Sequence, residues 1–175
     1  MEELIEIVTK FKENRNFTEI IPQILANKKL SEDLFLMVQT KMEYPFAEHA
    51  SWIMIHLCQE NPSFVQKHEK RLIDILFDTN NQTVLRNIVN ILNQLELTDY
   101  RESELIDLLV DFILDKKNKV ALHVYSIYLL IKFIKKYPEL KVEIDSVLEL
   151  KNENASPAYK VAVRNYHTIT SKLDF

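Results

Sequence analysis

Histidine, tryptophan and glutamate share one face of the segment that begins at residue 46, and this face offers the most varied set of functional groups in the chain. His49, Trp52, His56 and Glu60 are spaced as i, i+3, i+7 and i+11, which is helical spacing. Histidines seven positions apart lie about 10 Å apart along a helix, too far for one zinc ion. Two interpretations of Trp52 stay open, a recognition patch centred on the indole or a place in the hydrophobic core.

A second pattern places one cation-capable residue near the start of every other predicted helix. These residues are His49, Arg86, His123 and Arg164. They form either a basic rung for phosphate or carboxylate, or a set of structural charges, because partly buried charges normally occur paired. Removing one partner of such a pair would cost a few kcal/mol.

The segment 100–116 is apolar except for one acidic stripe formed by Glu104, Asp107, Asp111 and Asp115. Carboxylates in a row are suited to a basic peptide or to hard cations. The alternative is a helix face in contact with water, which by itself produces one row of charges.

Several kinds of catalytic chemistry are excluded by what the sequence lacks. It has no glycine, so phosphate loops, dinucleotide fingerprints and nucleophile elbows are absent. The single cysteine, Cys58, lies in an apolar helical stretch where it acts as a small hydrophobic residue. No spacing typical of zinc ligands or of an acid/base pair is found. We therefore expect a protein that is not an enzyme, with no catalytic, cofactor-binding or metal-binding residues and no cofactor.

Length and composition favour one globular domain over residues 1–175. The chain has a net charge of −4, is 47% hydrophobic and is 27% charged. Its first ten residues contain three glutamates, unlike a signal peptide, and its longest apolar run is Ile127–Ile131, far shorter than a membrane span. With one cysteine, an internal disulfide is impossible. We expect a cytoplasmic protein without membrane contact.

Apolar residues recur at helical spacing along almost the whole sequence, which predicts an all-α fold. Prolines 45, 62, 138 and 157 stand where helices are expected to start. Because glycine is missing, we expect asparagine to supply the left-handed residues at helix ends, at Asn27, Asn61, Asn80, Asn118 and Asn152. The predicted helices are 2–13, 18–27, 31–42, 46–59, 62–78, 82–96, 100–116, 119–136, 138–150 and 157–172.

The sequence repeats with a period of 37 residues. Shifting the chain by this length aligns residues 72–86 with 109–123, with five identities: Leu72/Leu109, Asp74/Asp111, Asp78/Asp115, Asn81/Asn118 and Leu85/Leu122. The repeating unit is a pair of helices. One such pair cannot bury its own apolar face, so successive pairs must stack into a solenoid.

Three stretches resemble the HEAT-repeat family, which is close to the armadillo-type repeats. In that family an acidic residue follows the first helix, and the second helix opens with valine and arginine. The corresponding residues are Asp78 with Val84-Leu85-Arg86, Asp115 with Val120-Ala121-Leu122-His123 and, more loosely, Tyr159 with Val163-Arg164. The resemblance covers residues 31–175.

This resemblance implies a right-handed α-solenoid (an α-α superhelix) of about four to five stacked antiparallel helix pairs. Residues 1–30 are then N-terminal capping helices, and residues 31–175 are HEAT-like repeats. It also implies a structural ladder that ties neighbouring units together through Asp78, Arg86, Asp115, His123 and Arg164. Family members serve as scaffolds, transport receptors, enzyme regulators and, in some cases, DNA-repair glycosylases.

The function we expect is a small adaptor or scaffold that binds a protein or peptide segment along its inner helices. The predicted partner-binding residues are Trp52, His56, Asn87, Asn90, Gln94, Tyr128 and Lys132. One alternative is a HEAT-like nucleic-acid-binding or DNA-repair protein, which the pI of 5.8 disfavours. Another is a structural subunit of a larger assembly. Residues 1–115 carry a net charge of −9 and residues 116–175 one of +5, so weak self-association through opposite ends is a further expectation.

Overall fold

The computed structural model describes residues 1–14, 17–152 and 155–173, and every regular element in these ranges is an α-helix. The predicted all-α class is therefore confirmed. The helices are α1 (Glu2–Asn14), α2 (Phe17–Ala26), α3 (Lys28–Gln39), α4 (Phe46–Glu60), α5 (Pro62–Gln66), α6 (Glu69–Asp78), α7 (Gln82–Gln94), α8 (Glu102–Leu114), α9 (Val120–Lys136), α10 (Leu140–Asn152) and α11 (Pro157–Thr170). They fall into two compact units, Met1–Leu97 and Thr98–Phe175. The prediction of one domain, with capping helices over residues 1–30, stays a prediction.

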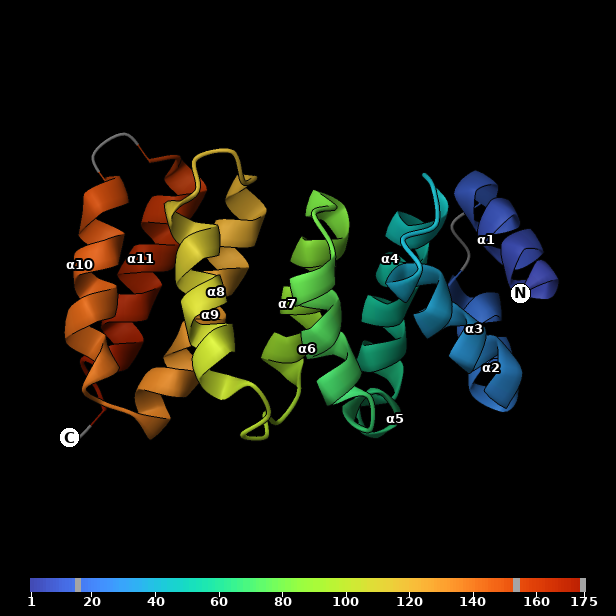
Figure 1. The fold of residues 1–175 in the computed structure, drawn as a ribbon, viewed down its shortest axis with the longest axis horizontal. Helices are drawn as coiled ribbons and strands as arrows, with labels where there is room; N and C mark the ends of the chain where they lie inside the picture. Colours follow the sequence, from blue (N-terminus) through green and yellow to red (C-terminus); the bar gives the residue numbers. More distant parts are fainter. Residues whose placement is uncertain (15–16, 153–154, 174–175) are drawn as a thin grey trace. The chain divides into compact units, whose positions relative to one another are not determined.

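The first unit is built on two stacked helix pairs, α3 with α4 and α6 with α7. The first helices of the two pairs, α3 and α6, contact each other, and so do the second helices, α4 and α7. The pairs therefore form two layers (Figure 1). Helices α1 and α2 pack against both α3 and α4. The apolar side chains Ile53, Met54 and Leu57 of α4 are fully buried as a result.

The second unit repeats this arrangement with α8 and α9 as one pair and α10 and α11 as the next (Figure 1). Helix α8 contacts α10, and α9 contacts α11. Helix α9 is the most deeply buried of the four, with Leu122, Ile127, Leu130 and Ile134 at 0% exposure. The predicted stacking of helix pairs is thus confirmed within each unit.

We expected asparagines to end helices, and Asn61 is the C-cap of α4, but asparagines also begin helices in this structure. Asn27, Asn61 and Asn81 are N-cap residues, and the side chain of each accepts a hydrogen bond from a backbone N–H in the following turn. None of the asparagines for which a left-handed conformation was predicted has positive φ in the described residues, so that prediction is wrong. At a helix start, the side-chain oxygen of asparagine accepts a hydrogen bond from an otherwise unpaired backbone N–H. This hydrogen bond stabilises the helix more than placing asparagine in the left-handed region at a helix end would.

Two long basic residues take the left-handed conformations instead, Lys41 at φ 55° and Arg101 at φ 50°. Lys41 follows α3, where its N–H donates to the carbonyl of Val38 while that of Met42 donates to Met37. These two bonds form a Schellman motif, which needs a left-handed residue at the position that lysine holds. Lys41 therefore bears backbone strain that glycine would avoid.

The predicted helix 62–78 is divided into α5 and α6 by a turn at Lys67 and His68. The His68 ring stacks on Phe35 of α3, with ring centroids 4.2 Å apart, and it lies tilted against Phe64 with centroids 5.7 Å apart. No proline or glycine marks the turn in the sequence, which is why the helical periodicity predicted one continuous helix.

Replacing Lys41 with glycine should raise the free energy of unfolding by about 1 kcal/mol, because it removes the left-handed strain and keeps both backbone hydrogen bonds. Chemical denaturation followed by circular dichroism measures the change. The matched control is Lys29→Gly in the first turn of α3, which should destabilise by up to about 1 kcal/mol. Equal destabilisation by the two glycines would contradict the assigned conformation of Lys41.

Candidate functional site

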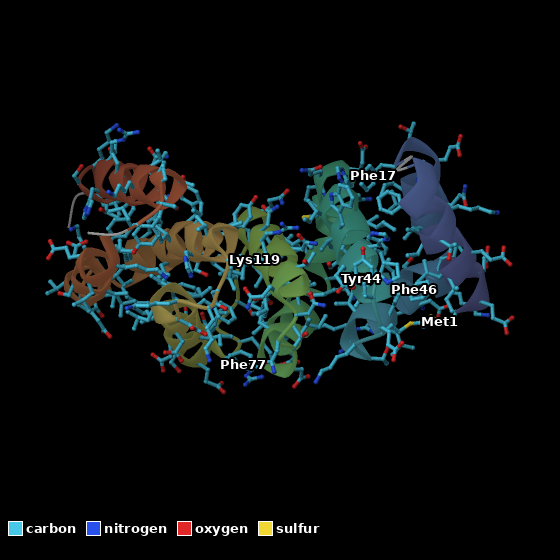
Figure 2. The ribbon with its side chains drawn as sticks, turned by 90° about the horizontal axis from the view of Figure 1, so that it is seen from above. Met1, Phe17, Tyr44, Phe46, Phe77 and Lys119 are labelled. Atoms are coloured by element: carbon cyan, nitrogen blue, oxygen red, sulfur yellow. The ribbon has the colours of Figure 1, made fainter. Side chains whose placement is uncertain are left out.

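Trp52 lies half-buried beneath the first two helices. Its ring centroid is 5.5 Å from that of Phe11 on α1 and 5.5 Å from that of Phe17 on α2, both in edge-to-face geometry. Phe11 and Phe17 also contact each other at 4.7 Å. Figure 2 shows Phe17 between the α1 and α4 ribbons. These contacts give the indole a packing role within the first unit.

His56, one turn further along α4, lines a hollow of about 360 Å³ between α2 and α4. Its ring lies 3.5 Å from that of Phe17, and burial lowers the pKa of the imidazole. The α2 wall of the hollow is mainly apolar, with Ile21 and Leu25, and Glu60 lies on the α4 side. The predicted face of α4 is therefore partly covered by α2, and His56 remains half-exposed beside this hollow.

Helices α4 and α7 are joined by buried or half-buried polar contacts. The Asn87 amide donates to the hydroxyl of Ser51 at 2.9 Å, and the Asn81 amide donates to Glu48 at 2.6 Å. Asn87 is only 1% exposed. The structure thus places Asn87 inside the contact between the two helices, away from the surface.

Asn90 and Gln94 occupy successive turns of α7 and are accessible. Asn90 is half-buried and Gln94 is exposed. The Gln94 amide donates to the backbone carbonyl of Asn90 at 3.2 Å, so the two residues follow one face of the helix. We call Asn90 and Gln94 the α7 strip.

In the second unit, Tyr128 and Lys132 stand on successive turns of α9, and both are half-buried. The Tyr128 hydroxyl accepts a hydrogen bond from the Asn165 amide of α11 at 3.1 Å. We call Tyr128 and Lys132 the α9 strip. Each unit therefore brings together its own part of the predicted partner-binding set.

The first rung of the predicted ladder does not bring its charges together. Asp78 is the exposed last residue of α6, and Arg86 lies half-buried on α7. The guanidinium donates to the side-chain oxygen of the adjacent Asn87 at 3.1 and 3.2 Å. Within the described ranges, no ion pair joins Asp78 to Arg86. In the second unit, Arg164 is exposed on α11.

The second rung is a contact between His123 and the main chain of Asp115. The Nε2 atom of His123 lies 3.2 Å from the Asp115 carbonyl oxygen and 3.0 Å from the Lys151 ammonium nitrogen. A protonated Nε2 can donate to the Asp115 carbonyl, whereas an unprotonated Nε2 can accept from the Lys151 ammonium, so the two contacts belong to different tautomers of the neutral ring. Burial, with a smaller effect of the Lys151 charge, lowers the pKa of His123. The imidazole is therefore neutral at pH 7.

The acidic stripe of α8 is exposed along its whole length, from Glu104 to Asp115. No group of three or more histidine, cysteine or acidic side chains in the described residues could hold a metal ion. Cys58 is buried, and burial raises the pKa of its thiol, which keeps it protonated. Among the helices described, none is long and apolar enough to cross a membrane.

Comparison with protein-family models decides which family the chain resembles. A model described as a HEAT repeat domain matches residues 6–169. The chain belongs to the HEAT repeat domain family. The HEAT-type α-solenoid predicted from the repeat and from the Asp/Val/Arg pattern is thereby confirmed as its fold class. Comparisons of this HEAT-repeat chain with curated proteins and with solved structures found no match.

Several residues that shape these sites were missed by the sequence analysis. The covering of Trp52 by Phe11 and Phe17 was missed, because periodicity places a residue on a face without saying what packs there. The contact of His123 with Lys151 joins two residues 28 positions apart, a separation unrelated to the 37-residue repeat. Neither contact has a local signal in the sequence.

Replacing Trp52 with alanine should lower the free energy of unfolding by about 2–4 kcal/mol, because Phe11 and Phe17 lose the ring they pack against. Urea denaturation measures the loss. Tyr44 is 73% exposed in the same unit, so Tyr44→Ala is the matched aromatic control and should change stability by less than about 0.5 kcal/mol. A stable Trp52→Ala variant would instead favour a role in recognition alone.

Acidification should destabilise the protein between pH 7.5 and 5.5. Burial is the largest cause of the lowered pKa of His56, His68 and His123, so the unfolded chain takes up protons at pH values where these folded imidazoles stay neutral. Stability is then present above the unfolded pKa of about 6.5 and falls as the pH drops below it. His123→Gln, whose amide oxygen can accept from Lys151, should give a shallower fall in thermal midpoint. An unchanged slope would contradict the burial-lowered pKa of His123.

Proposed function

We propose that this HEAT-repeat chain is a non-catalytic protein-interaction module that binds a segment of a partner protein along its second helices. HEAT repeat domains are commonly scaffolds for protein interaction, and this chain matches the family over residues 6–169. The observation that carries the proposal is the presence of accessible polar strips on deeply buried helices in both units. Such helices hold their exposed side chains in fixed positions, which lowers the entropy cost of binding.

The α7 strip supplies amides that can donate to and accept from a peptide backbone. The α9 strip adds an aromatic ring and a cation, a mixture that is typical of protein interfaces. His56 contributes a half-exposed ring on α4. Asn87 is left out of the proposed surface because its side chain is buried against Ser51, and Trp52 supports the surface from beneath.

The test begins with a photocrosslinking amino acid at Gln94, which recovers the partner from cells of the native host. Affinity for the purified partner is then measured for Asn90→Arg/Gln94→Arg and for Lys132→Glu. We expect each variant to lose at least about tenfold in affinity, or about 1.4 kcal/mol, because the added bulk or reversed charge blocks contact with the partner. The thermal midpoint of each variant shows whether it remains folded.

Matched controls are available in both units. Gln23→Arg changes an exposed glutamine on α2, and Lys135→Glu reverses an exposed lysine on α9. Both should keep full affinity. Loss of affinity in the controls but not in the strip variants would place the partner elsewhere and refute the proposal. An electrophoretic shift of duplex DNA at low salt would favour the nucleic-acid alternative.

The cytoplasmic location and the weak self-association through oppositely charged ends remain predictions. Light scattering at low salt and high concentration tests the second, and a monomer under those conditions would contradict it.

A further inference from the structure

The second unit contains a hollow of about 450 Å³ where three helix ends meet. Its walls come from the start of α9, the end of α10 and the start of α11. The polar part of the lining consists of Lys116, Asn118, His123, Lys151 and Ser156. This volume lies in the range of small-molecule sites and is separate from the α9 strip, so the inference below does not depend on the proposed function.

Two lysines give the hollow a positive charge. The Lys151 ammonium is half-buried and is held by the Ile113 carbonyl and by His123 Nε2, which leaves one of its three donors for a ligand. No hydrogen bond or ion pair ties Lys116 to another residue that the structure describes. The carboxylate of Asp115 accepts the backbone N–H of Lys117 at 2.9 Å and does not line the hollow, although its negative charge acts on Lys151 and His123.

The helix dipoles add to this positive potential. Helices α9 and α11 both start at the hollow, and neither has an acidic residue in its first turn. The N-terminal ends of these helices carry partial positive charge. Nearby lysines repel this charge, whereas a bound anion would neutralise it. Burial also lowers the pKa of Lys151, partly opposed by the charge of Asp115, so the ammonium lacks full compensation in the protein alone.

The rim of the hollow is apolar. Val120 is 37% exposed and Leu150 is 79% exposed, and both line it. The buried Tyr159 forms part of the wall, and its ring lies 5.9 Å from the Lys151 ammonium. A ligand with an apolar group beside its charged group would cover the apolar surface of Val120 and Leu150, which water now contacts, and this burial favours binding.

We propose that this hollow binds a small phosphate monoester, with the phosphoryl group between Lys116 and Lys151 and its apolar part against Val120 and Leu150. Two ammonium groups match a phosphoryl dianion better than the single charge of a carboxylate. Helix α9 begins beside this hollow, so the positive end of its dipole lies near the same group. In the tautomer with an unprotonated Nε2, neutral His123 accepts a hydrogen bond from Lys151 and acts as a positioning residue.

The test uses phenyl phosphate as the probe, titrated at constant ionic strength into the isotope-labelled full chain. Backbone amide shifts in NMR spectra report the site. We expect saturable shifts confined to residues 116–123, 150–151 and 155–159. Benzoate should bind at least about tenfold more weakly, because it carries one charge fewer, and inorganic phosphate should also bind more weakly because it lacks the apolar group.

Lys116→Gln should reduce the affinity for phenyl phosphate at least about tenfold without loss of folding, since Lys116 is exposed and holds no described partner. Lys151→Gln tests the second charge, and its spectrum shows at once whether the unit remains folded. Lys135→Gln is the matched control, because it removes an equal charge from the opposite end of α9 and should leave binding unchanged.

Four results would overturn the proposal. Shifts scattered over surface lysines would show non-specific attraction, as would unchanged affinity in Lys116→Gln. Benzoate binding as tightly as phenyl phosphate would mean a carboxylate site. Inorganic phosphate binding more tightly than phenyl phosphate would refute the contact with Val120 and Leu150.

Discussion

Burial of the second helices between neighbouring helices is the interaction on which each unit depends. A helix pair exposes apolar side chains that it cannot cover by itself, and the next pair covers them. Ile53 and Leu57 of α4 and Ile88 and Leu92 of α7 are fully buried in this way. Each such side chain contributes about 1.5–3 kcal/mol, which offsets much of the entropy lost when the chain is ordered.

Polar contacts inside this apolar packing determine how the helices align. The Asn87 amide reaches the Ser51 hydroxyl across the α4–α7 contact, and both residues are buried. A shift of one helix turn would leave these groups without hydrogen bonds in an apolar environment, at a cost of about 1–3 kcal/mol each. The apolar residues therefore supply most of the stability, and the asparagine fixes the alignment. The same reasoning explains why an asparagine expected to contact a partner lies in the interior.

Much of the fold could be predicted from the sequence, because helical periodicity and the 37-residue repeat both follow from apolar burial. The bounds of α4, α7 and α9 lie within two residues of their predicted values. The turn at His68 and the left-handed Lys41 could not be predicted, since the path of the chain imposes both against local preference. For the candidate sites, the sequence gives the helix face of a residue such as Tyr128. It does not give the packing above Trp52, because that depends on helices whose contacts the repeat does not specify.

The two ends of α9 differ in how their charges are compensated, and this difference supports the proposed phosphate site. At the C-terminal end, Lys136 pairs with Asp99 and Glu102, and these partners raise the pKa of its ammonium group. A cation at this end also agrees with the helix dipole. At the N-terminal end the dipole favours an anion, yet the side chains that gather there include Lys116 and Lys151. Sequences depart from such local preferences mainly where function requires it. A bound phosphoryl group would add to the single negative charge of Asp115 at the N-terminal end, as Asp99 and Glu102 together supply negative charge at the other end.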